Sequence, residues 1–314
     1  MTQKFFCSTA SFEEGEPLPG LGNPFARLLL VRAPRGEWRA LRQRVLAGEG
    51  RFGNAAKAAI ATGSRVVFID RADSDDVPAL LSYPDPTAVR TTDNKDAIED
   101  MIVAWCRGAP LRGEPERRTT ILCCTDGKTD PCCARFSMAT FRALTAHADP
   151  AIFNLLQASH LGGCRFATTL ITMPDHARYG RLVPDQVPAF LEALGAGQPY
   201  LPALRGIGRL GEAAQVATVG ALRWAAERGL GAPPVSIGED APAIADAYAM
   251  AETDPSTCAI PLRVGDTELV AHLRRERFPA LDACPSVEAS FGRSPPRWVL
   301  EMLAPAGERS RSVA

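Results

Sequence analysis

The 314-residue sequence lacks the features that define several large classes of protein. It has no uninterrupted apolar run of about 18 residues, the length that a membrane-spanning helix needs. Its first ten residues contain no apolar segment of signal-peptide length. Its formal net charge is only −1, so it has no excess of basic residues for nucleic acid or an anionic membrane. We therefore expect a cytoplasmic protein that binds neither nucleic acid nor membranes.

Motifs of common enzyme classes are also missing. There is no P-loop, no convincing catalytic triad and no recognisable site with two paired carboxylates. A Gly-x-Gly-x-x-Gly run does occur at 206–211, but we expect no strand before it, so the context of a dinucleotide site is absent. The sequence is 46% hydrophobic with 26 Gly and 26 Pro, which predicts a well-packed, loop-rich chain of two or three domains.

The cysteines are concentrated in one stretch. Residues 123–165 hold five of the nine cysteines and two of the four histidines, of which His160 lies in a second loop. An odd number of cysteines, four of them in adjacent pairs, does not suit a disulfide framework, so reduced thiols and a metal site fit better. The adjacent pairs are Cys123-Cys124 and Cys132-Cys133.

Two loops of this stretch contain donors for one centre. The first loop carries both cysteine pairs, and the second carries His160 and Cys164 as His-x3-Cys. Donors on two loops at the same end of neighbouring strands can converge on one point. Cys124 and Cys133 have eight residues between them, too many for the Cys-x2-Cys knuckle of a zinc ribbon, and no second Cys-x2-Cys follows. The spacing favours an iron–sulfur cluster over structural zinc.

The same motifs resemble a known family. The pattern Cys-Thr-x-Gly-x-x-Asp-x-Cys-Cys at 124–133, followed by Ser-His-Leu-Gly-Gly-x-Arg-Phe-Ala at 159–167, is similar to the sucrase/ferredoxin-like family of thioredoxin-fold [2Fe-2S] proteins. A looser resemblance extends from Cys7 to about Leu230. The resemblance implies a [2Fe-2S] cluster held by two cysteines of the first motif and two residues of the second. Carried over by position, the ligands are Cys124, Cys133, His160 and Cys164.

The sequence departs from the family pattern at two positions. Cys164 stands where the family usually has a second histidine, which implies three thiolates and one imidazole. Asp126 stands where the family usually has another histidine, and its role is open. Cys123 and Cys132 are also separated by eight residues, so they are an alternative pair of ligands, although Cys123 suits the end of a buried strand.

The predicted elements occur twice in the same order. Leu170–Asp175 matches Leu80–Asp85 at an offset of 90, and the apolar positions of a helix at 187–194 match those at 98–105 at an offset of 89. Together with the fold that the resemblance implies, this predicts an α/β protein of two tandem thioredoxin-like (βαβ-ββα) halves and a smaller α+β C-terminal region. The predicted domains are 1–108, 109–200 and 201–314.

The repeat has a consequence for the ligands. Moving His160 and Cys164 back by 90 gives Asp70 and Ser74, so we expect the first half to carry no cluster. Its expected role is to pack against the second half and to shield or present the site.

Secondary structure follows from apolar runs, caps and breakers. Beyond residue 200 we expect a linker through Gly206 and Gly208 and then a helix with many small residues. The predicted strands are 28–31, 66–69, 79–83, 88–90, 120–123, 152–158, 259–264, 268–273 and 298–302, and the predicted helices are 38–45, 54–62, 94–107, 134–146, 187–194, 212–227 and 241–251, with a frayed end at 308–314.

Other reactive side chains receive structural assignments. Lys128 and Asp130 are a polar loop tip or a docking surface for a redox partner, and Arg165 is either solvated or beside the cluster. Gly162-Gly163 either brings backbone N–H groups to the cluster or forms a plain turn. We interpret Cys7, Cys106, Cys258 and Cys284 as packing or incidental thiols and His147, His176 and His272 as structural or surface residues.

The sequence is compatible with three functions. The first is a one-electron carrier with a mixed Cys/His [2Fe-2S] cluster, which takes an electron from a reductase and passes it to an acceptor protein. The second is a thiol–disulfide oxidoreductase using Cys124 with Cys133 or Cys132, although a Cys-x2-Cys is absent. The third is a zinc-stabilised interaction module with the same ligands. We favour the carrier, which needs no catalytic residue of its own.

Overall fold

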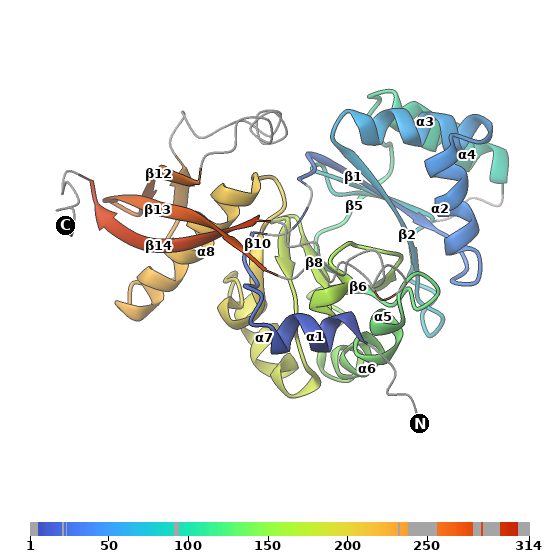
Figure 1. The fold of residues 1–314 in the computed structure, drawn as a ribbon. Helices are drawn as coiled ribbons and strands as arrows, with labels where there is room; N and C mark the ends of the chain where they lie inside the picture. The colour runs from blue at the N-terminus through green and yellow to red at the C-terminus, as the bar shows by residue number, and fades with distance from the viewer. Residues whose placement is uncertain are drawn as a thin grey trace.

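A computed structural model shows a mixed α/β protein built on one large and one small sheet (Figure 1). The described residues are 6–20, 22, 24–90, 94–231, 233–237, 256–278, 284 and 296–306. Their large sheet has ten strands in the order β10-β9-β8-β6-β7-β2-β1-β3-β4-β5, and their small sheet has four in the order β11-β12-β13-β14. The α/β class predicted from the sequence is confirmed.

The first group of elements follows the prediction with shifts of a few residues at the ends, except for α1 and β5, which we did not predict. The N-cap of α4 is Asn94, whose side chain accepts hydrogen bonds from the backbone N–H groups of Asp96 and Ala97. The elements are α1 (Cys7–Glu13), β1 (Arg27–Arg32), α2 (Trp38–Ala47), α3 (Gly50–Ala61), β2 (Ser64–Asp70), β3 (Leu80–Tyr83), β4 (Thr87–Val89), α4 (Lys95–Cys106) and β5 (Glu114–Pro115).

The second group repeats much of this order. Its predicted helix over 134–146 is divided into two helices, and the first of them begins earlier, at Pro131, because the fixed φ of proline suits the first helical position. The elements are β6 (Thr119–Cys124), α5 (Pro131–Arg135), α6 (Ser137–His147), β7 (Phe153–Ala158), η1 (Cys164–Phe166), β8 (Leu170–Met173), β9 (Ala177–Tyr179), η2 (Pro184–Gln186) and α7 (Val187–Gly195).

The strands of the two groups pair in the same way. β1 lies between parallel β2 and antiparallel β3, and β6 lies between parallel β7 and antiparallel β8. The register is also equivalent. Leu28 faces Arg65 and Tyr83 in the first group, and in the second group Thr120 faces Asn154 and Met173, at offsets of 92, 89 and 90 residues.

The two groups join into one sheet with a shared core on one face. β2 and β7 pair antiparallel where Ile69 faces Ala158. Side chains alternate along a strand, so Leu28 and Leu122 point into the shared core, which both groups line. The other face has two separate cores, one beneath α2, α3 and α4 and one beneath α6 and α7. The predicted ligand loops therefore have both halves as neighbours.

The segment expected to be a linker is partly a strand. β10 (Leu204–Ile207) pairs with β9 and extends the large sheet, so a strand leads into the Gly-x-Gly-x-x-Gly run and includes its first two residues, contrary to our expectation. Its glycines make room for side chains of this chain. A Cβ on Gly206 would lie 2.6 Å from Oε1 of Gln215, and one on Gly208 would lie 3.0 Å from Nε of Arg178. The close approach that glycine permits is thus used for internal packing.

The C-terminal region is a helix packed on the small sheet (Figure 1). The small residues Ala217, Ala221 and Ala225 are fully buried against it, as their size predicts. The predicted helix over 241–251 and the frayed end at 308–314 lie outside the described residues. The elements are α8 (Glu212–Glu227), β11 (Val235–Ile237), β12 (Thr257–Val264), β13 (Thr267–Arg277) and β14 (Pro296–Pro305).

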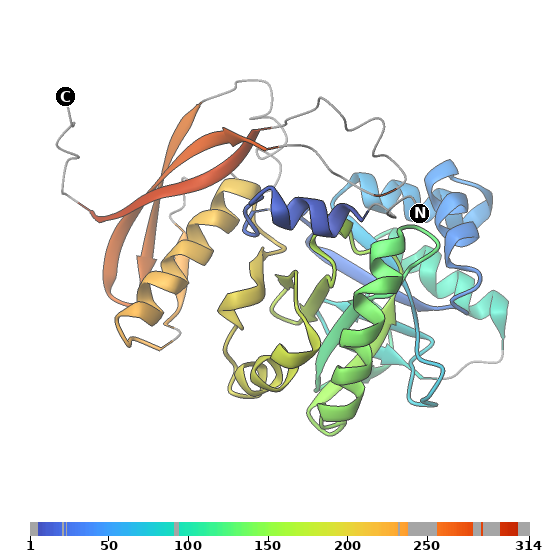
Figure 2. The same ribbon diagram turned by 60° about the horizontal axis from the view of Figure 1, so that its bottom comes forward.

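The N-terminal lead-in, residues 7–20, belongs to the predicted domain 1–108. It nevertheless lies against the second group of elements. α1 contacts η1, and the ring of Phe6 packs edge-on against that of Phe136 with centroids 5.7 Å apart. In both ribbon views α1 lies between the small sheet and the α5–α6 helices (Figures 1 and 2). Sequence order therefore did not predict which half this helix covers.

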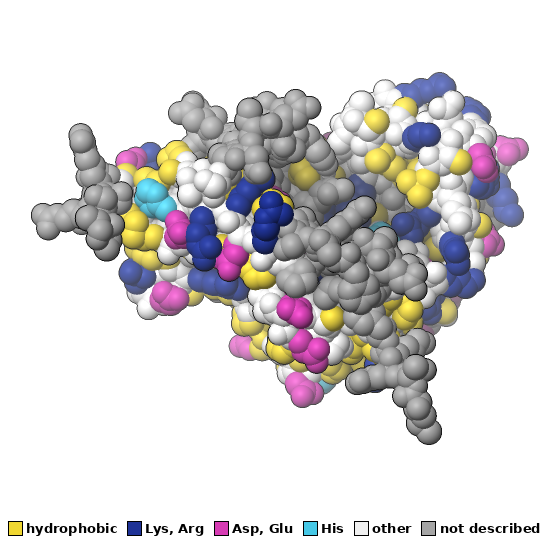
Figure 3. Space-filling view, in the orientation of Figure 1, with side chains coloured by type: hydrophobic (Ala, Val, Ile, Leu, Met, Phe, Trp, Pro, Cys, Tyr) yellow, Lys and Arg dark blue, Asp and Glu magenta, His cyan; other side chains and the backbone are white. Residues whose placement is uncertain are grey.

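The surface agrees with the near-neutral charge of the sequence. On the face shown in Figure 3, basic and acidic side chains are interspersed over both the first half and the small sheet. Across the described residues, we find no helix with the length and apolar character needed to cross a membrane.

Candidate metal centre

The predicted cysteines of the first loop lie at the end of β6 and in α5. Cys124 shares a face of β6 with Leu122 and points into the shared core, and Cys133 reaches the same core from α5. Cys123 points to the opposite face. The Sγ atoms of Cys124 and Cys133 are 3.5 Å apart, so the structure brings this predicted pair together.

The second loop brings two more donors to the same place. Gly162 and Gly163 have φ values of 83° and 75°, a left-handed turn that favours glycine and places Cys164 at the start of η1. Nδ1 of His160 lies 3.3 Å from Sγ of Cys164. Sγ of Cys164 lies in turn 3.8 Å from Sγ of Cys133. All four predicted ligands are therefore gathered at one end of the parallel strands β6 and β7.

The alternative pair is not brought together. Sγ of Cys123 lies 4.0 Å from the backbone oxygen of Ser137 in the core beneath α6. Cys132 is in the shared core on the other face of the sheet. Burial raises the pKa of Cys123 well above its usual value, as expected for a packing thiol.

The pKa values of the Cys124 and Cys133 thiols are shifted in opposite directions. The neighbouring Cys133 thiol lowers the pKa of Cys124, and the backbone N–H groups of Asp126 and Leu161 lower it further, although burial opposes them. The pKa of Cys133 is raised, because it lies between Cys124 and Cys164 and is buried. Backbone N–H groups directed at Cys124 are the kind of donor that stabilises a thiolate or a metal-bound sulfur.

His160 is held in the neutral form that binds metals. Burial lowers its pKa to about 4, and the positive charges of Arg42 and Arg65 act in the same direction. Its Nδ1 faces Cys164, so this nitrogen is the one directed at the thiols. Cys124, Cys133 and Cys164 are at most 2% exposed, whereas His160 is half-buried. The imidazole is therefore the most exposed of the four.

Two arginines place positive charge beside the thiols. Arg65, on β2, donates a hydrogen bond to the backbone oxygen of His160 at 3.4 Å, and its charge acts on Cys124. Arg205, on β10, is 2% exposed, and its charge acts on Cys164. Burial lowers the pKa of Arg65 to about 10 and that of Arg205 to about 9. Both arginines therefore stay charged at neutral pH. Neither residue has a local signal in the sequence that predicts this role.

Asp126, whose role was open, connects the two ligand loops. Its side chain is buried and accepts hydrogen bonds from the backbone N–H groups of Thr129 and His160 at 3.2 and 3.3 Å. It also pairs with Arg42 of α2 at 3.5 Å. A carboxylate that binds both loops and the first half positions His160 rather than acting as a ligand.

Two further expectations are settled by contacts. Arg165 is buried rather than solvated, and its Nε donates to Glu16, in the N-terminal segment after α1, at 2.8 Å. A Cβ on Gly163 would lie 2.7 Å from a guanidinium nitrogen of Arg205, so this glycine makes room for that arginine. The N–H groups directed at Cys124 come instead from Asp126 and Leu161.

The remaining cysteines divide into two kinds. Cys106 and Cys258 are half-buried against separate cores, as expected for packing thiols. Cys7 and Cys284 differ from that expectation. Both lie beside Cys132, with Sγ–Sγ distances of 3.5 and 3.3 Å. Sequence separation hid this group, because its members are 125 and 152 residues apart.

The first half has no equivalent of the ligands. By strand register the counterpart of Cys124 is Arg32, and that of His160 is Arg71 rather than the expected Asp70, because β2 and β7 are offset by 89 residues. The counterpart of Cys164 falls in a loop where the offset changes to 90. None of these first-half residues is a cysteine or histidine.

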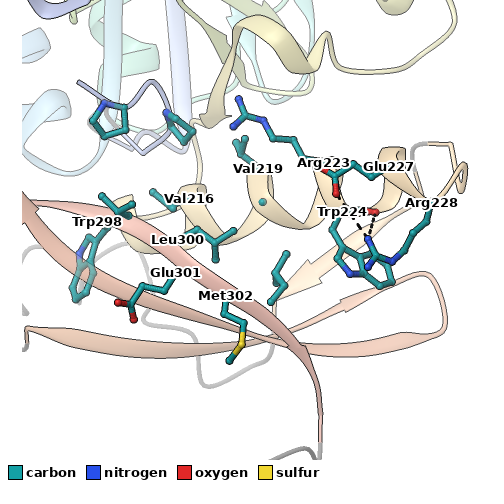
Figure 4. Close-up of a pocket in the computed structure, with 15 residues that line it drawn as sticks. Val216, Val219, Arg223, Trp224, Glu227, Arg228, Trp298, Leu300, Glu301 and Met302 are labelled. Atoms are coloured by element: carbon teal, nitrogen blue, oxygen red, sulfur yellow. Dashed lines mark hydrogen bonds and ion pairs between the residues drawn. The ribbon is translucent and has the colours of Figure 1, made fainter. Parts of the chain in front are cut away.

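A groove of about 470 Å³ lies elsewhere, between α8 and β14 (Figure 4). Val216 of the helix and Trp298 and Leu300 of the strand line it. The charged residues Arg223, Glu227 and Glu301 line it as well, so its walls are both apolar and charged. None of the described residues that line it is a cysteine or a histidine. The groove is therefore separate from the thiol chemistry.

The donor set fits a two-iron cluster. Each iron of a [2Fe-2S] cluster takes two protein ligands, and here the donors form two close pairs, Cys124 with Cys133 and His160 with Cys164. Thiolate and imidazole are both established ligands of such clusters. The half-buried Arg65 and the buried Arg205 beside two of the thiols suit the negative charge that three thiolates bring.

Comparison with known proteins identifies the family of the chain. Residues 18–206 match the model of the sucrase/ferredoxin-like family, and the chain belongs to that family. A search of curated proteins gives no match. Two solved structures of a thioredoxin-like [2Fe-2S] ferredoxin from Aquifex aeolicus are 20% identical; each matches 28% of this chain, with 91% and 97% of the ferredoxin covered and TM-scores of 0.26 and 0.25. Similarity at this level does not by itself define a fold or a function.

Proposed function

We propose that this protein is a one-electron carrier with a [2Fe-2S] cluster bound by Cys124, Cys133, His160 and Cys164. The observation that supports it is the convergence of these four donors from two loops on one buried point. When bound, the cluster would supply a centre that accepts and releases a single electron. No acid, base or nucleophile of the protein is needed for that step.

The protein's own residues would control the charge of the centre. Three thiolates are negative, and an added electron makes the site more negative. Arg65 beside Cys124 and Arg205 beside Cys164 offset that charge where solvent cannot screen it. They therefore stabilise the reduced state relative to the oxidised one.

The proposed route for electrons between the cluster and a partner protein passes through His160. It is the most exposed of the four ligands, and transfer needs a short path between the cluster and a partner protein. Three nearby side chains are cationic. Arg42 contacts the first ligand loop, Arg35 approaches the backbone oxygen of Thr125 at 3.5 Å, and Lys128 donates to Gly36. Reductase and acceptor partners with acidic docking surfaces suit this edge.

We further propose that the fold consists of two tandem thioredoxin-like halves, of which only the second binds the cluster. The equivalent pairing and register of the two groups of strands support the repeat. In this view the protein functions in the cytoplasm, where its thiols stay reduced.

Thiol–disulfide exchange is the second candidate, and burial argues against it. Cys124 and Cys133 are close enough to react with one another, but both are fully buried. A thiol that attacks a disulfide of another protein must be accessible.

The test is the colour and composition of protein purified without oxygen. We expect visible charge-transfer absorption with about two irons and two acid-labile sulfides per chain. We also expect an electron paramagnetic resonance signal from a half-integer spin after reduction. Colourless protein without sulfide, even after anaerobic reconstitution with iron and sulfide, would contradict the proposal.

A further inference from the structure

A second group of donors lies beside the proposed cluster. Sγ of Cys132 is 3.5 Å from Sγ of Cys7 and 3.3 Å from Sγ of Cys284. The carboxylate of Asp130 faces the same point, with Oδ2 3.7 Å from Sγ of Cys7. One donor atom from each of the four residues lies within 4.8 Å of all the others. Cys7, Asp130 and Cys132 are fully buried.

Backbone hydrogen bonds hold these donors from three separate parts of the chain. The N–H group of Cys284 donates to Oδ2 of Asp130 at 2.9 Å, and that of Cys7 donates to Sγ of Cys284 at 3.3 Å. Oδ1 of Asp130 accepts from the N–H group of Cys132 at 2.9 Å, as the N-cap of α5. A buried carboxylate beside three thiols is costly without a compensating charge, and a divalent cation would provide one.

The spacing of this group fits a single tetrahedral ion. With Zn–S bonds of about 2.3 Å and a Zn–O bond of about 2.0 Å, tetrahedral geometry puts sulfurs about 3.8 Å apart and sulfur about 3.5 Å from oxygen. The corresponding distances here are 3.3 and 3.5 Å between sulfurs and 3.7 Å from sulfur to oxygen. These three distances differ from the tetrahedral values by at most about half an ångström, and the other three lie within 4.8 Å.

We propose that Cys7, Asp130, Cys132 and Cys284 bind one zinc ion in a structural site separate from the electron-transfer centre. Three thiolates and a carboxylate complete the tetrahedron and leave no open position for a substrate. The three thiol protons pass to solvent on binding, and no electron is transferred because Zn²⁺ has no redox chemistry. The ion ties α1 and Cys284 to α5, whose next residue is Cys133.

The site has a role in relation to the cluster. Cys132 and Cys133 are adjacent in α5, so the proposed zinc lies one residue away from a proposed cluster ligand. It also joins the N-terminal helix and a residue from the C-terminal part of the chain to the ligand loop. We expect zinc to hold these segments over the shared core and to limit access of solvent to the thiols.

The test measures zinc, iron and visible absorption on the same full-length preparations. The variants are Cys7→Ser and Cys284→Ser, and the control is Cys258→Ser, a half-buried thiol on β12. We expect one zinc per chain in the wild type and the control and at least about a tenfold loss of zinc affinity in both variants, with iron and absorption unchanged. X-ray absorption at the zinc edge should show three sulfur ligands and one oxygen ligand.

Several results would overturn the site. One is wild-type protein, grown with added zinc, that carries its full iron but no zinc. Another is zinc retained by both variants or bound without sulfur ligands. A disulfide from Cys132 to Cys7 or Cys284 in the purified protein would show thiol pairing instead of metal binding. Loss of iron together with zinc in both variants would assign these cysteines to the cluster.

Discussion

The two groups of strands share one pairing pattern but differ completely in ligands. Residues 8–105 contain no cysteine and no histidine, whereas residues 123–164 contain five cysteines and two histidines. Equivalent strands in equivalent register are therefore not enough to make a metal centre. What distinguishes the halves is the chemistry of the loops that follow β6 and β7, where Arg32 and Arg71 in the first half replace Cys124 and His160.

The first half contributes charge instead of ligands. Arg42 contacts Asp126 and Thr129 in the first ligand loop, and Arg65 contacts the backbone of His160 in the second. The antiparallel pairing of β2 with β7 brings these cations to the neighbouring half. The comparison therefore predicts a division of roles, in which the second half binds the proposed cluster and the first half sets its electrostatic surroundings.

The largest expected effect is loss of the cluster from the second half. Cys124→Ser or Cys133→Ser should reduce iron from about two per chain to nearly none, because each substitution removes a thiolate from an iron. Iron and sulfide analysis checks this. Cys123→Ser is the matched control, since its side chain lies on the opposite face of β6.

The same experiment tests whether the proposed ligands of the second half hold the iron. If the double variant Cys124→Ser/Cys133→Ser still binds iron stoichiometrically, the metal is held elsewhere. If Cys123→Ser removes the iron and Cys124→Ser does not, the ligand register is shifted by one residue.

The next effect concerns the imidazole. A thiolate in place of His160 adds negative charge, so His160→Cys should lower the reduction potential by on the order of 100 mV. Potentiometric titration followed by electron paramagnetic resonance measures the shift. His147→Ala, an exposed position at the end of α6, should leave the potential unchanged. An unchanged potential and spectrum in His160→Cys would exclude His160 as a ligand.

A smaller effect tests the contribution of the first half. Arg65→Gln removes a positive charge near Cys124 and should lower the potential by some tens of mV with the iron content retained. Arg39→Gln, an exposed arginine on α2 of the same half, is the control. Equal potentials in the two variants would show that the first half acts only by packing.

The smallest effect lies away from the centre, at His176 in the turn between β8 and β9. The equivalent first-half residue is Pro86. Burial lowers the pKa of His176 to about 4, and neither ring nitrogen has a hydrogen-bond partner among the described residues. The unfolded chain therefore binds a proton near pH 6.5 that the folded chain does not bind until about pH 4.

Stability should consequently fall as the pH drops through this window. The expected loss attributable to His176 is about 2 kcal/mol between pH 7.5 and 5, measured by urea unfolding. His176→Asn should remove this part of the pH dependence, and asparagine tolerates the positive φ of 59° at that position. Identical pH dependence in both proteins would show that His176 is protonated in the fold.

Local patterns were sufficient to predict most elements, whereas the four proposed ligands were predicted from the family resemblance of the two motifs. Apolar runs, caps and helical spacing predicted β1, α4 and α7 to within a few residues, because these signals depend on near neighbours in the chain. The offset of about 90 residues predicted the repeated strand order. The two motifs predicted four donors that the structure places together, because each motif follows a strand and the two strands are adjacent and parallel.

Contacts between distant segments could not be predicted in this way. The strand β10 is short and contains glycine, so only pairing with β9 reveals it. Arg65 and Arg205 have no local mark of their role, because it arises from burial beside thiols that the sheet brings to them.

The sequence by itself determined the elements, their repeat and the spacing of the four donors in the second half, because these depend on residues a few positions apart. Only the tertiary structure decided which residues surround those donors. Cys7, Cys132 and Cys284 meet across more than a hundred residues of chain. The closing of such long loops is stabilised by the assembled core rather than by any local pattern.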